Sequence, residues 1–230
     1  MQIKQYIPNA LTCANLVCGC LGIIEVLEGN LVWAPYLIWL AAIFDFFDGF
    51  AARTLKVSSP IGGELDSLAD MVTFGVLPSL VLFAMLREAA VPAWVPYLAL
   101  VVAIFSALRL AKFNVDTRQT TSFIGVPTPA NALLISAFPL IVLRHPDWSF
   151  MHHPAFLLVI AFGMSYLLVA EIPLFALKFK NFSWRHNQVK YIFLGLSVLL
   201  VIFFNIVAIP LIIMLYVLLS LFNKEREISH

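Results

Sequence analysis

Four aspartates stand in two pairs within a short stretch of an otherwise apolar chain. Asp45 and Asp48 are three residues apart, and Asp66 and Asp70 are four apart. Residues at these spacings share one face of a helix, so each pair directs two carboxylates the same way. Between the pairs lies a segment rich in turn-forming residues, namely Ser58, Ser59, Pro60, Gly62 and Gly63. The pattern predicts an antiparallel helix hairpin whose acidic faces meet.

Four gathered carboxylates repel one another, and burying each ion costs several kcal/mol. Protonation or a bound cation relieves this cost. Oxygen ligands without His or Cys suit hard ions such as Mg²⁺, Mn²⁺ or Ca²⁺. Four carboxylates can hold two divalent ions about 4 Å apart, and such a pair can clamp a phosphoryl group during in-line displacement.

The residues around the acids favour a nucleotide or diphosphate ligand. Gly49 and Ala52 remove side-chain bulk beside the acidic face. Arg53 is placed to meet phosphate oxygens. Gly62 and Gly63 fall where the second helix of the hairpin begins, and a helix N-terminus favours anions.

Either pair alone would fit a proton or ion relay or a helix–helix hydrogen bond. All four together, with Gly, Ala and Arg between them, favour a functional site. Glu64 falls on another side of its helix from Asp70 and is not counted as a ligand. Glu25 and Glu171 lie in other apolar runs, where we expect span ends or buried hydrogen bonds.

The composition indicates which elements must position these acids. The chain has 230 residues, 62% apolar and 12% charged, with a mean hydropathy of +0.95. A soluble domain has roughly a quarter of its residues charged, so a soluble globular protein is excluded. The 20 Phe exclude disorder, and a net charge of +1 argues against a nucleic-acid partner.

The apolar runs show no β-barrel alternation, so the expected fold is all-α, a polytopic transmembrane helical bundle. At about 20 residues per span, the chain holds about eight. The predicted spans are 8–27, 31–54, 62–86, 92–113, 128–144, 154–177, 188–204 and 206–222. The last division rests on Asn205 and Pro210. We expect one integral-membrane catalytic domain, residues 1–230, whose first apolar run is retained as a span.

Eight spans place twelve of the 14 Lys and Arg on the side of both termini, and only Arg87 and Arg144 on the other. The positive-inside rule then makes the termini and the aspartates cytoplasmic. Two polar loops, Asn114–Pro127 and Lys178–Lys190, fall on the same side. The three cysteines, Cys13, Cys18 and Cys20, are interpreted as helix-packing residues and not as a disulfide framework or a metal pair.

The spacing of the acidic stretch resembles a known family motif. The matching positions are Asp45-x2-Asp48-Gly49-x2-Ala52-Arg53-x8-Gly62-x3-Asp66-x3-Asp70. Every fixed position of this pattern resembles the motif of the CDP-alcohol phosphatidyltransferases. Members bind a CDP-linked donor and two divalent ions, Mg²⁺ or Mn²⁺, and transfer a phosphatidyl group to an alcohol with release of CMP.

The resemblance implies a role for each matching position. Asp45, Asp48 and Asp66 would be metal ligands, and Asp70 both a ligand and the general base. The donor's CDP would lie against Gly49, Ala52, Arg53 and Gly62. The resemblance also implies a homodimer.

Further segments resemble the members of this family that use serine, the CDP-diacylglycerol–serine O-phosphatidyltransferases. These segments are Pro8-Asn9-x-Leu11-Thr12, Asp66-Ser67-Leu68-Ala69-Asp70, Arg109-Leu110-Ala111-Lys112-Phe113-Asn114 and Phe123-x-Gly125-Val126-Pro127-x-Pro129-Ala130. The resemblance implies transfer from CDP-diacylglycerol to L-serine in an inner cell membrane. Arg109 and Lys112, three apart on one helix face, are candidates for the serine carboxylate. Their alternative role is ordinary cytoplasmic snorkelling.

Two alternatives stay open. A transferase of the same family would use glycerol phosphate or inositol phosphate, which calls for more cations near the cluster. A divalent-ion transporter would use the aspartates as its binding site. The position of the aspartates near helix ends argues against the transporter.

Overall fold

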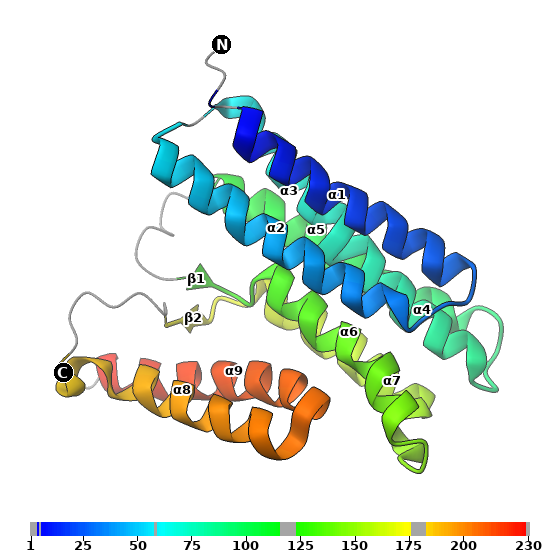
Figure 1. Cartoon of the computed structure of the whole chain (residues 1–230). Helices are drawn as coiled ribbons and strands as arrows, with labels where there is room; N and C mark the ends of the chain where they lie inside the picture. The colour runs from blue at the N-terminus through cyan, green and yellow to red at the C-terminus, as the bar shows by residue number, and fades with distance from the viewer. Residues whose placement is uncertain (1–3, 5, 58, 116–122, 176–182, 229–230) are drawn as a thin grey trace.

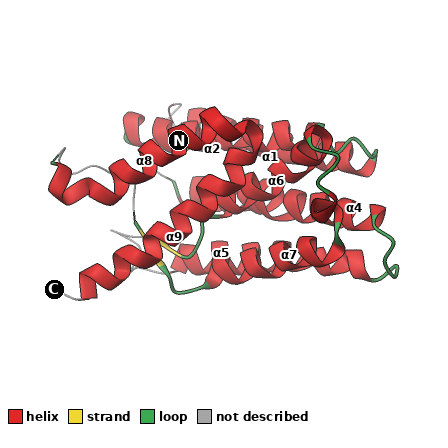
Figure 2. Ribbon diagram, turned by 90° about the horizontal axis from the view of Figure 1, so that it is seen from below, coloured by secondary structure: helices red, strands yellow, loops and turns green. Residues whose placement is uncertain are grey.

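The long helices of the protein run side by side as a bundle, and α8 and α9 form a hairpin against one side (Figures 1 and 2). The computed structural model describes residue 4 and residues 6–57, 59–115, 123–175 and 183–228. The α-helices are α1 (Tyr6–Leu27), α2 (Trp33–Leu55), α3 (Pro60–Asp70), α4 (Leu77–Glu88), α5 (Val101–Val115), α6 (Thr128–Arg144), α7 (Pro154–Val169), α8 (Trp184–Phe204) and α9 (Ala208–Ile228). A π-helical segment, Met71–Val76, joins α3 to α4, and 3₁₀ segments cover Val95–Leu100, Ser149–His152 and Asn205–Val207.

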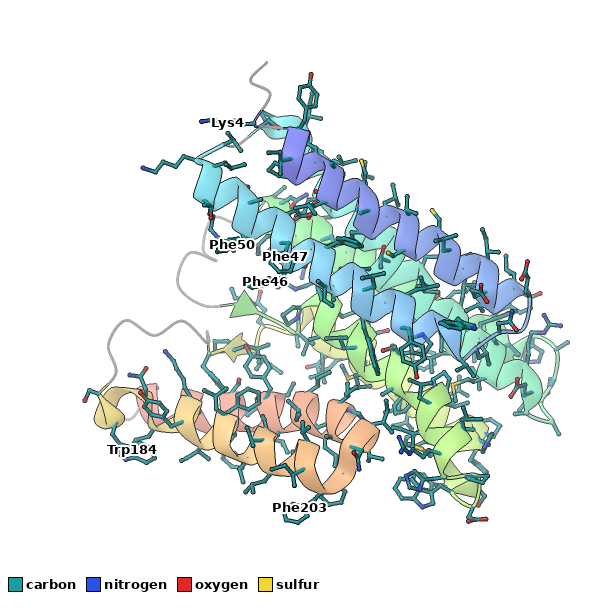
Figure 3. The ribbon with its side chains drawn as sticks, in the orientation of Figure 1. Lys4, Phe46, Phe47, Phe50, Trp184 and Phe203 are labelled. Atoms are coloured by element: carbon teal, nitrogen blue, oxygen red, sulfur yellow. The ribbon has the colours of Figure 1, made fainter. Side chains whose placement is uncertain are left out.

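Each of the eight predicted spans contains a helix. Five helical stretches are long and apolar enough to cross a membrane, and α6 and α7 are shorter apolar helices of 17 and 16 residues. Large apolar side chains stay exposed along the bundle, including Phe46 and Phe50 on α2 and Phe203 on α8 (Figure 3). Such a surface suits lipid and not water. A polytopic helical membrane protein is therefore confirmed, and the number of crossings stays a prediction.

The last apolar stretch, Asn187–Phe222, is 36 residues long and is divided where the sequence predicts. Asn205 adopts φ +49°, α8 ends just before it, and α9 returns alongside α8 (Figure 1). Pro210 lies in the first turn of α9, where a missing N–H leaves no helical hydrogen bond unmade. The reversal therefore lies at Asn205 and the 3₁₀ segment that follows it, ahead of Pro210.

The predicted span 154–177 is wrong at its end, because α7 stops at Val169. Pro173 disfavours helix in the residue before it. The chain instead becomes extended, and β2 (Pro173–Leu174) pairs antiparallel with β1 (Phe123–Ile124). The expectation of helices alone therefore misses this small β-ladder beside the bundle.

A short connection joins α2 to α3 at the end of the bundle where the N-terminus lies (Figure 1). Lys56 takes a left-handed conformation, and Val57 N donates to Ala52 O at 3.0 Å, which closes α2 with a Schellman motif. Ser59 then caps α3, accepting from Gly62 N at 2.9 Å. Pro60 and the two glycines therefore belong to the first turn of α3 and not to the turn itself.

The π-helical segment begins directly after Asp70. Leu77 N is bonded to Val72 O, five residues back, and Pro78 has no N–H to offer the carbonyl of Phe74. Such local rewinding is frequent at functional sites. It separates the acidic helix α3 from the apolar helix α4 within one continuous helical stretch, Pro60–Glu88, which we call the rod.

Glycines let α1 lie very close to this rod. A Cβ at Gly19 would collide with Thr73, and one at Gly22 would collide with Leu77. Small residues at such contacts allow two membrane helices to pack backbone to backbone. The depth at which α1 sits beside the acidic helices is thereby fixed.

We predict that Gly19→Ala destabilises the protein, because overpacking a tight contact costs about 1–3 kcal/mol. The matched control is Gly163→Ala in α7, where an added Cβ meets nothing within 4 Å. The midpoint of thermal unfolding in detergent should fall for the first variant and hold or rise for the second. Equal midpoints would contradict close packing at Gly19.

Candidate metal and substrate site

The four aspartates converge between α2 and α3. One carboxylate oxygen from each of Asp45, Asp48 and Asp66 lies within 4.8 Å of the other two. Asp70 stands one turn beyond Asp66 on α3, and its carboxyl adjoins that of Asp45. The hairpin predicted from the sequence thus brings both acidic pairs to one place.

The first helix also contributes to this cluster, which the sequence interpretation missed. Thr12 Oγ1 donates to Asp48 Oδ2 at 2.7 Å, and Asn15 Nδ2 donates to Asp70 Oδ1 at 3.1 Å. The signal in the sequence was two polar residues three apart within an apolar run. Their spacing puts both on one helix face.

The cluster fits a hard divalent cation. Asp48 and Asp70 are 6% and 8% exposed. Within the described parts of the chain, Asp66 Oδ1 is buried and has no hydrogen-bond partner. A buried carboxylate oxygen without a partner is costly, and a cation would offset that cost. The donor set is oxygen only, as Mg²⁺, Mn²⁺ and Ca²⁺ require.

A cavity of about 250 Å³ opens beside the cluster. It is lined by Pro8, Asn9, Thr12, Asp48, Gly49, Ala52, Val57, Ser59, Gly62, Gly63 and Asp66. Three of the residues predicted to contact the donor, Gly49, Ala52 and Gly62, are therefore on its wall. The cavity also reaches the capped start of α3, where backbone N–H groups favour an anion.

Arg53, the fourth predicted donor contact, is exposed and folds back over Gly49. A Cβ at Gly49 would stand 3.3 Å from Arg53 Nη1. Glycine at this position therefore leaves room for the guanidinium beside the cavity wall. A cation here is suited to the phosphate oxygens of a ligand in the cavity.

Arg109 and Lys112 lie on α5 in different surroundings. Arg109 is 5% exposed, its Nε donates to Val126 O at 3.4 Å, and its guanidinium lies over the Phe113 ring at 5.5 Å. Lys112 is exposed. The shared face predicted for them thus splits into one buried and one exposed cation.

A hydrogen-bonded contact ties α5 to α3 near the cluster. Asn114 Nδ2 donates to Ser67 Oγ at 2.9 Å, next to Asp66. The polar loop predicted at Asn114–Pro127 is described only at its two ends, because residues 116–122 lie outside the described residues. Three of the twelve Lys and Arg that the prediction assigns to the side of the termini also lie outside them, namely Arg118, Lys178 and Lys180.

The remaining candidates stand apart from the cluster. Glu64 is exposed on α3 and lies outside the group formed by Asp45, Asp48 and Asp66. Cys13 and Cys20 are exposed, and Cys18 is buried in the core; all three are free thiols.

The apolar helices and the carboxylate cluster at one end of the bundle define the class of protein: a helical membrane protein whose cluster of carboxylates is suited to a divalent cation. The sequence profile of the CDP-alcohol phosphatidyltransferases matches residues 5–222. The chain belongs to this family.

Several relatives carry the name CDP-diacylglycerol–serine O-phosphatidyltransferase. The chain is 38% identical to that of Bacillus subtilis over 78% of this chain and 92% of the relative. It is 33% identical to that of Helicobacter pylori, over 87% and 80%. It is 32% identical to that of Methanocaldococcus jannaschii, over 81% and 94%.

We predict that Asp66→Asn weakens Mn²⁺ binding by at least about tenfold, because it removes one charged ligand from the cluster. The control is Glu64→Gln, which removes a charge two residues away on the exposed side of α3. Free Mn²⁺ is measured by electron paramagnetic resonance during titration of the purified protein. An equal loss in both variants would mean that the effect is general surface charge.

Proposed function

We propose that this chain transfers the phosphatidyl group of CDP-diacylglycerol to L-serine, forming phosphatidylserine and CMP. The proposal rests on the convergence of Asp45, Asp48 and Asp66, with Asp70 next to Asp45, beside a cavity lined by Gly49, Ala52 and Gly62. The names of the relatives support serine as the acceptor.

In this proposal, Asp45, Asp48, Asp66 and Asp70 hold two divalent cations, Mg²⁺ or Mn²⁺. When bound, such ions neutralise phosphate charge and orient an in-line displacement. The geometry of the cluster, with three ligand oxygens within 4.8 Å, is consistent with this use. The CDP part of the donor then lies in the cavity, with Arg53 over Gly49 against its phosphate oxygens.

Asp70 is assigned as the general base. It takes the proton of the serine hydroxyl as the serine oxygen forms a bond to the phosphorus of the phosphatidyl group. The bond from that phosphorus to the oxygen of CMP breaks, and CMP leaves with the electron pair. General-base assistance of this kind is worth about 10²–10⁴ in rate. The position of Asp70, buried and next to Asp45, supports a role at the reacting centre.

The serine carboxylate is assigned to Arg109 and Lys112. The burial of Arg109 favours it as the stronger contact, because a charge-assisted hydrogen bond gains strength away from water. Lys112, which is exposed, would act by attraction at longer range.

We also propose one integral-membrane catalytic domain over residues 1–230, a homodimer, and an inner cell membrane with termini and site on the cytoplasmic side. The structure offers support for the sidedness. The α2–α3 connection lies at the end of the bundle where the chain starts (Figure 1). The start of α8 and the end of α9 lie toward that same end (Figures 1 and 2). Arg87 and Arg144 lie in the last turns of α4 and α6 at the opposite end.

The test of the function is release of CMP from CDP-diacylglycerol by the purified chain in detergent with Mn²⁺. We expect release that depends on L-serine and stops in excess EDTA. Glycerol phosphate and inositol phosphate are the competing acceptors in the same assay. Transfer to one of these and not to serine would overturn the acceptor, and absence of release with any acceptor would overturn the transferase.

We predict that Arg109→Ala raises the KM for serine by roughly tenfold to a hundredfold, the effect of losing one charge-assisted hydrogen bond of about 1.5–3 kcal/mol. Lys112→Ala should raise it less. The KM for CDP-diacylglycerol should move little in either variant. Kinetics with each substrate varied in turn decide the matter, and an unchanged serine KM in both variants would remove these residues from the acceptor site.

A further inference from the structure

Two buried side chains of α1 each contact a different helix of the aspartate hairpin. Thr12, 3% exposed, bonds to Asp48 on α2, and Asn15, fully buried, bonds to Asp70 on α3. Neither residue belongs to the acidic motif. In Figure 1, α1 lies alongside α2 and α3.

We infer that Thr12 and Asn15 are positioning residues, Thr12 orienting Asp48 toward a bound cation and Asn15 orienting Asp70 toward the acceptor hydroxyl. The inference rests on the proposed function and assigns to α1 a part in it. A carboxylate turns easily about its last side-chain bond, which is a broad, roughly two-fold torsion. A fixed donor on one oxygen leaves the other oxygen in a defined direction.

The direction of the hydrogen bond between Asn15 and Asp70 follows from the chemistry of the two groups. An ionised carboxylate only accepts hydrogen bonds, so the amide must present Nδ2 to Asp70. Asp70 Oδ1 is thereby engaged at 3.1 Å, and this contact fixes the direction in which Oδ2 points. Among the described residues, Asn15 Oδ1 is buried and has no hydrogen-bond partner. A buried Asn with a structural role usually has hydrogen-bond partners for both its amide NH₂ and its amide oxygen. Asn15 has a partner for the NH₂, and that partner is the proposed general base Asp70.

The Thr12 hydroxyl has one hydrogen and two acceptors within reach. Asp48 Oδ2 is 2.7 Å away, and the carbonyl oxygen of Pro8 is 3.1 Å away. The shorter distance and the charged acceptor favour Asp48. Thr12 also lines the cavity, so the side chain that is bonded to Asp48 is part of the cavity wall.

The packing of α1 holds these two donors at a fixed depth. Thr73, in the π-helical segment after Asp70, donates from Oγ1 to the backbone carbonyl of Asn15 at 3.2 Å. Gly19, one turn further along α1, lies directly against the same Thr73. The position of Asn15 along the helix axis is therefore locked to the rod that carries Asp70.

The first experiment measures Mn²⁺ binding to the purified full chain by electron paramagnetic resonance. Thr12→Val keeps the shape and removes the hydroxyl, and it should weaken Mn²⁺ binding about tenfold, or about 1.4 kcal/mol. Thr12→Ser restores the hydroxyl and should bind Mn²⁺ like the wild type. Cys13→Ala, an exposed neighbour on α1, is the control. Wild-type binding by Thr12→Val, or equal losses in the Val and Ser variants, would overturn the role of Thr12.

The second experiment compares rate with donor binding. Asn15→Leu keeps the volume and removes the donor, so CMP release at saturating substrates and Mn²⁺ should fall by about tenfold to a hundredfold. Binding of CDP-diacylglycerol should stay within about threefold of wild type. If Asn15→Leu fails to fold, Asn15→Ser is measured in its place with the same expectation. An unchanged rate would overturn the role of Asn15, as would a parallel fall in rate, donor binding and thermal midpoint.

Failure of the inference and failure of the proposed function are distinguishable. A wild-type chain that releases no CMP with any acceptor removes the function, and the Mn²⁺ titrations still decide the role of Thr12. An active wild type with unaffected Thr12 and Asn15 variants removes only the positioning role.

Discussion

Four carboxylates held together within an apolar bundle lose hydration and repel one another, and the surrounding structure is arranged around that cost. Charges inside a membrane segment are expensive and mark functional positions. Here Asp48 and Asp70 receive hydrogen bonds from α1, whereas Asp66 keeps a buried oxygen without a partner in the described parts of the chain. A divalent cation bound at this position would offset the cost of that buried oxygen.

The α2–α3 connection and the glycines around the cluster help to bring the four carboxylates together and to make room beside them. The Schellman motif at the end of α2 and the Ser59 cap reverse the chain within a few residues, so that two helices can face each other with their acids. Glycines at 19 and 22 bring α1 close to Thr73 and Leu77, on the stretch that follows Asp70, and Asn15 of α1 reaches the Asp70 carboxylate. Glycine at 49 leaves the space into which the Arg53 guanidinium folds. At this site the glycines therefore matter because they lack side chains, which allows close helix packing and leaves space for Arg53.

The sequence predicted the parts of this structure that follow from local rules. Helical periodicity placed each aspartate pair on one face, and hydropathy found the eight apolar segments, including the reversal at Asn205. The early end of α7 was missed because hydropathy does not detect the backbone preference imposed by Pro173 or the pairing of its strand with β1. The contacts of Thr12 and Asn15 were missed for a different reason. They depend on how closely α1 packs against α2 and α3, and Gly19 and Gly22 contribute to this by letting α1 lie against Thr73 and Leu77. The different surroundings of Arg109 and Lys112 likewise depend on tertiary packing and not on their spacing.

The most direct test of the central claim is the anomalous diffraction of Mn²⁺ in crystals of the full chain. We expect Mn²⁺ at the hairpin, coordinated by carboxylate oxygens of Asp45, Asp48 and Asp66 at about 2.0–2.6 Å, the range for hard cations on oxygen. The crystals should come from a preparation that releases CMP with Mn²⁺ present. Mn²⁺ bound elsewhere in such crystals, with no anomalous signal at the hairpin, would contradict the account.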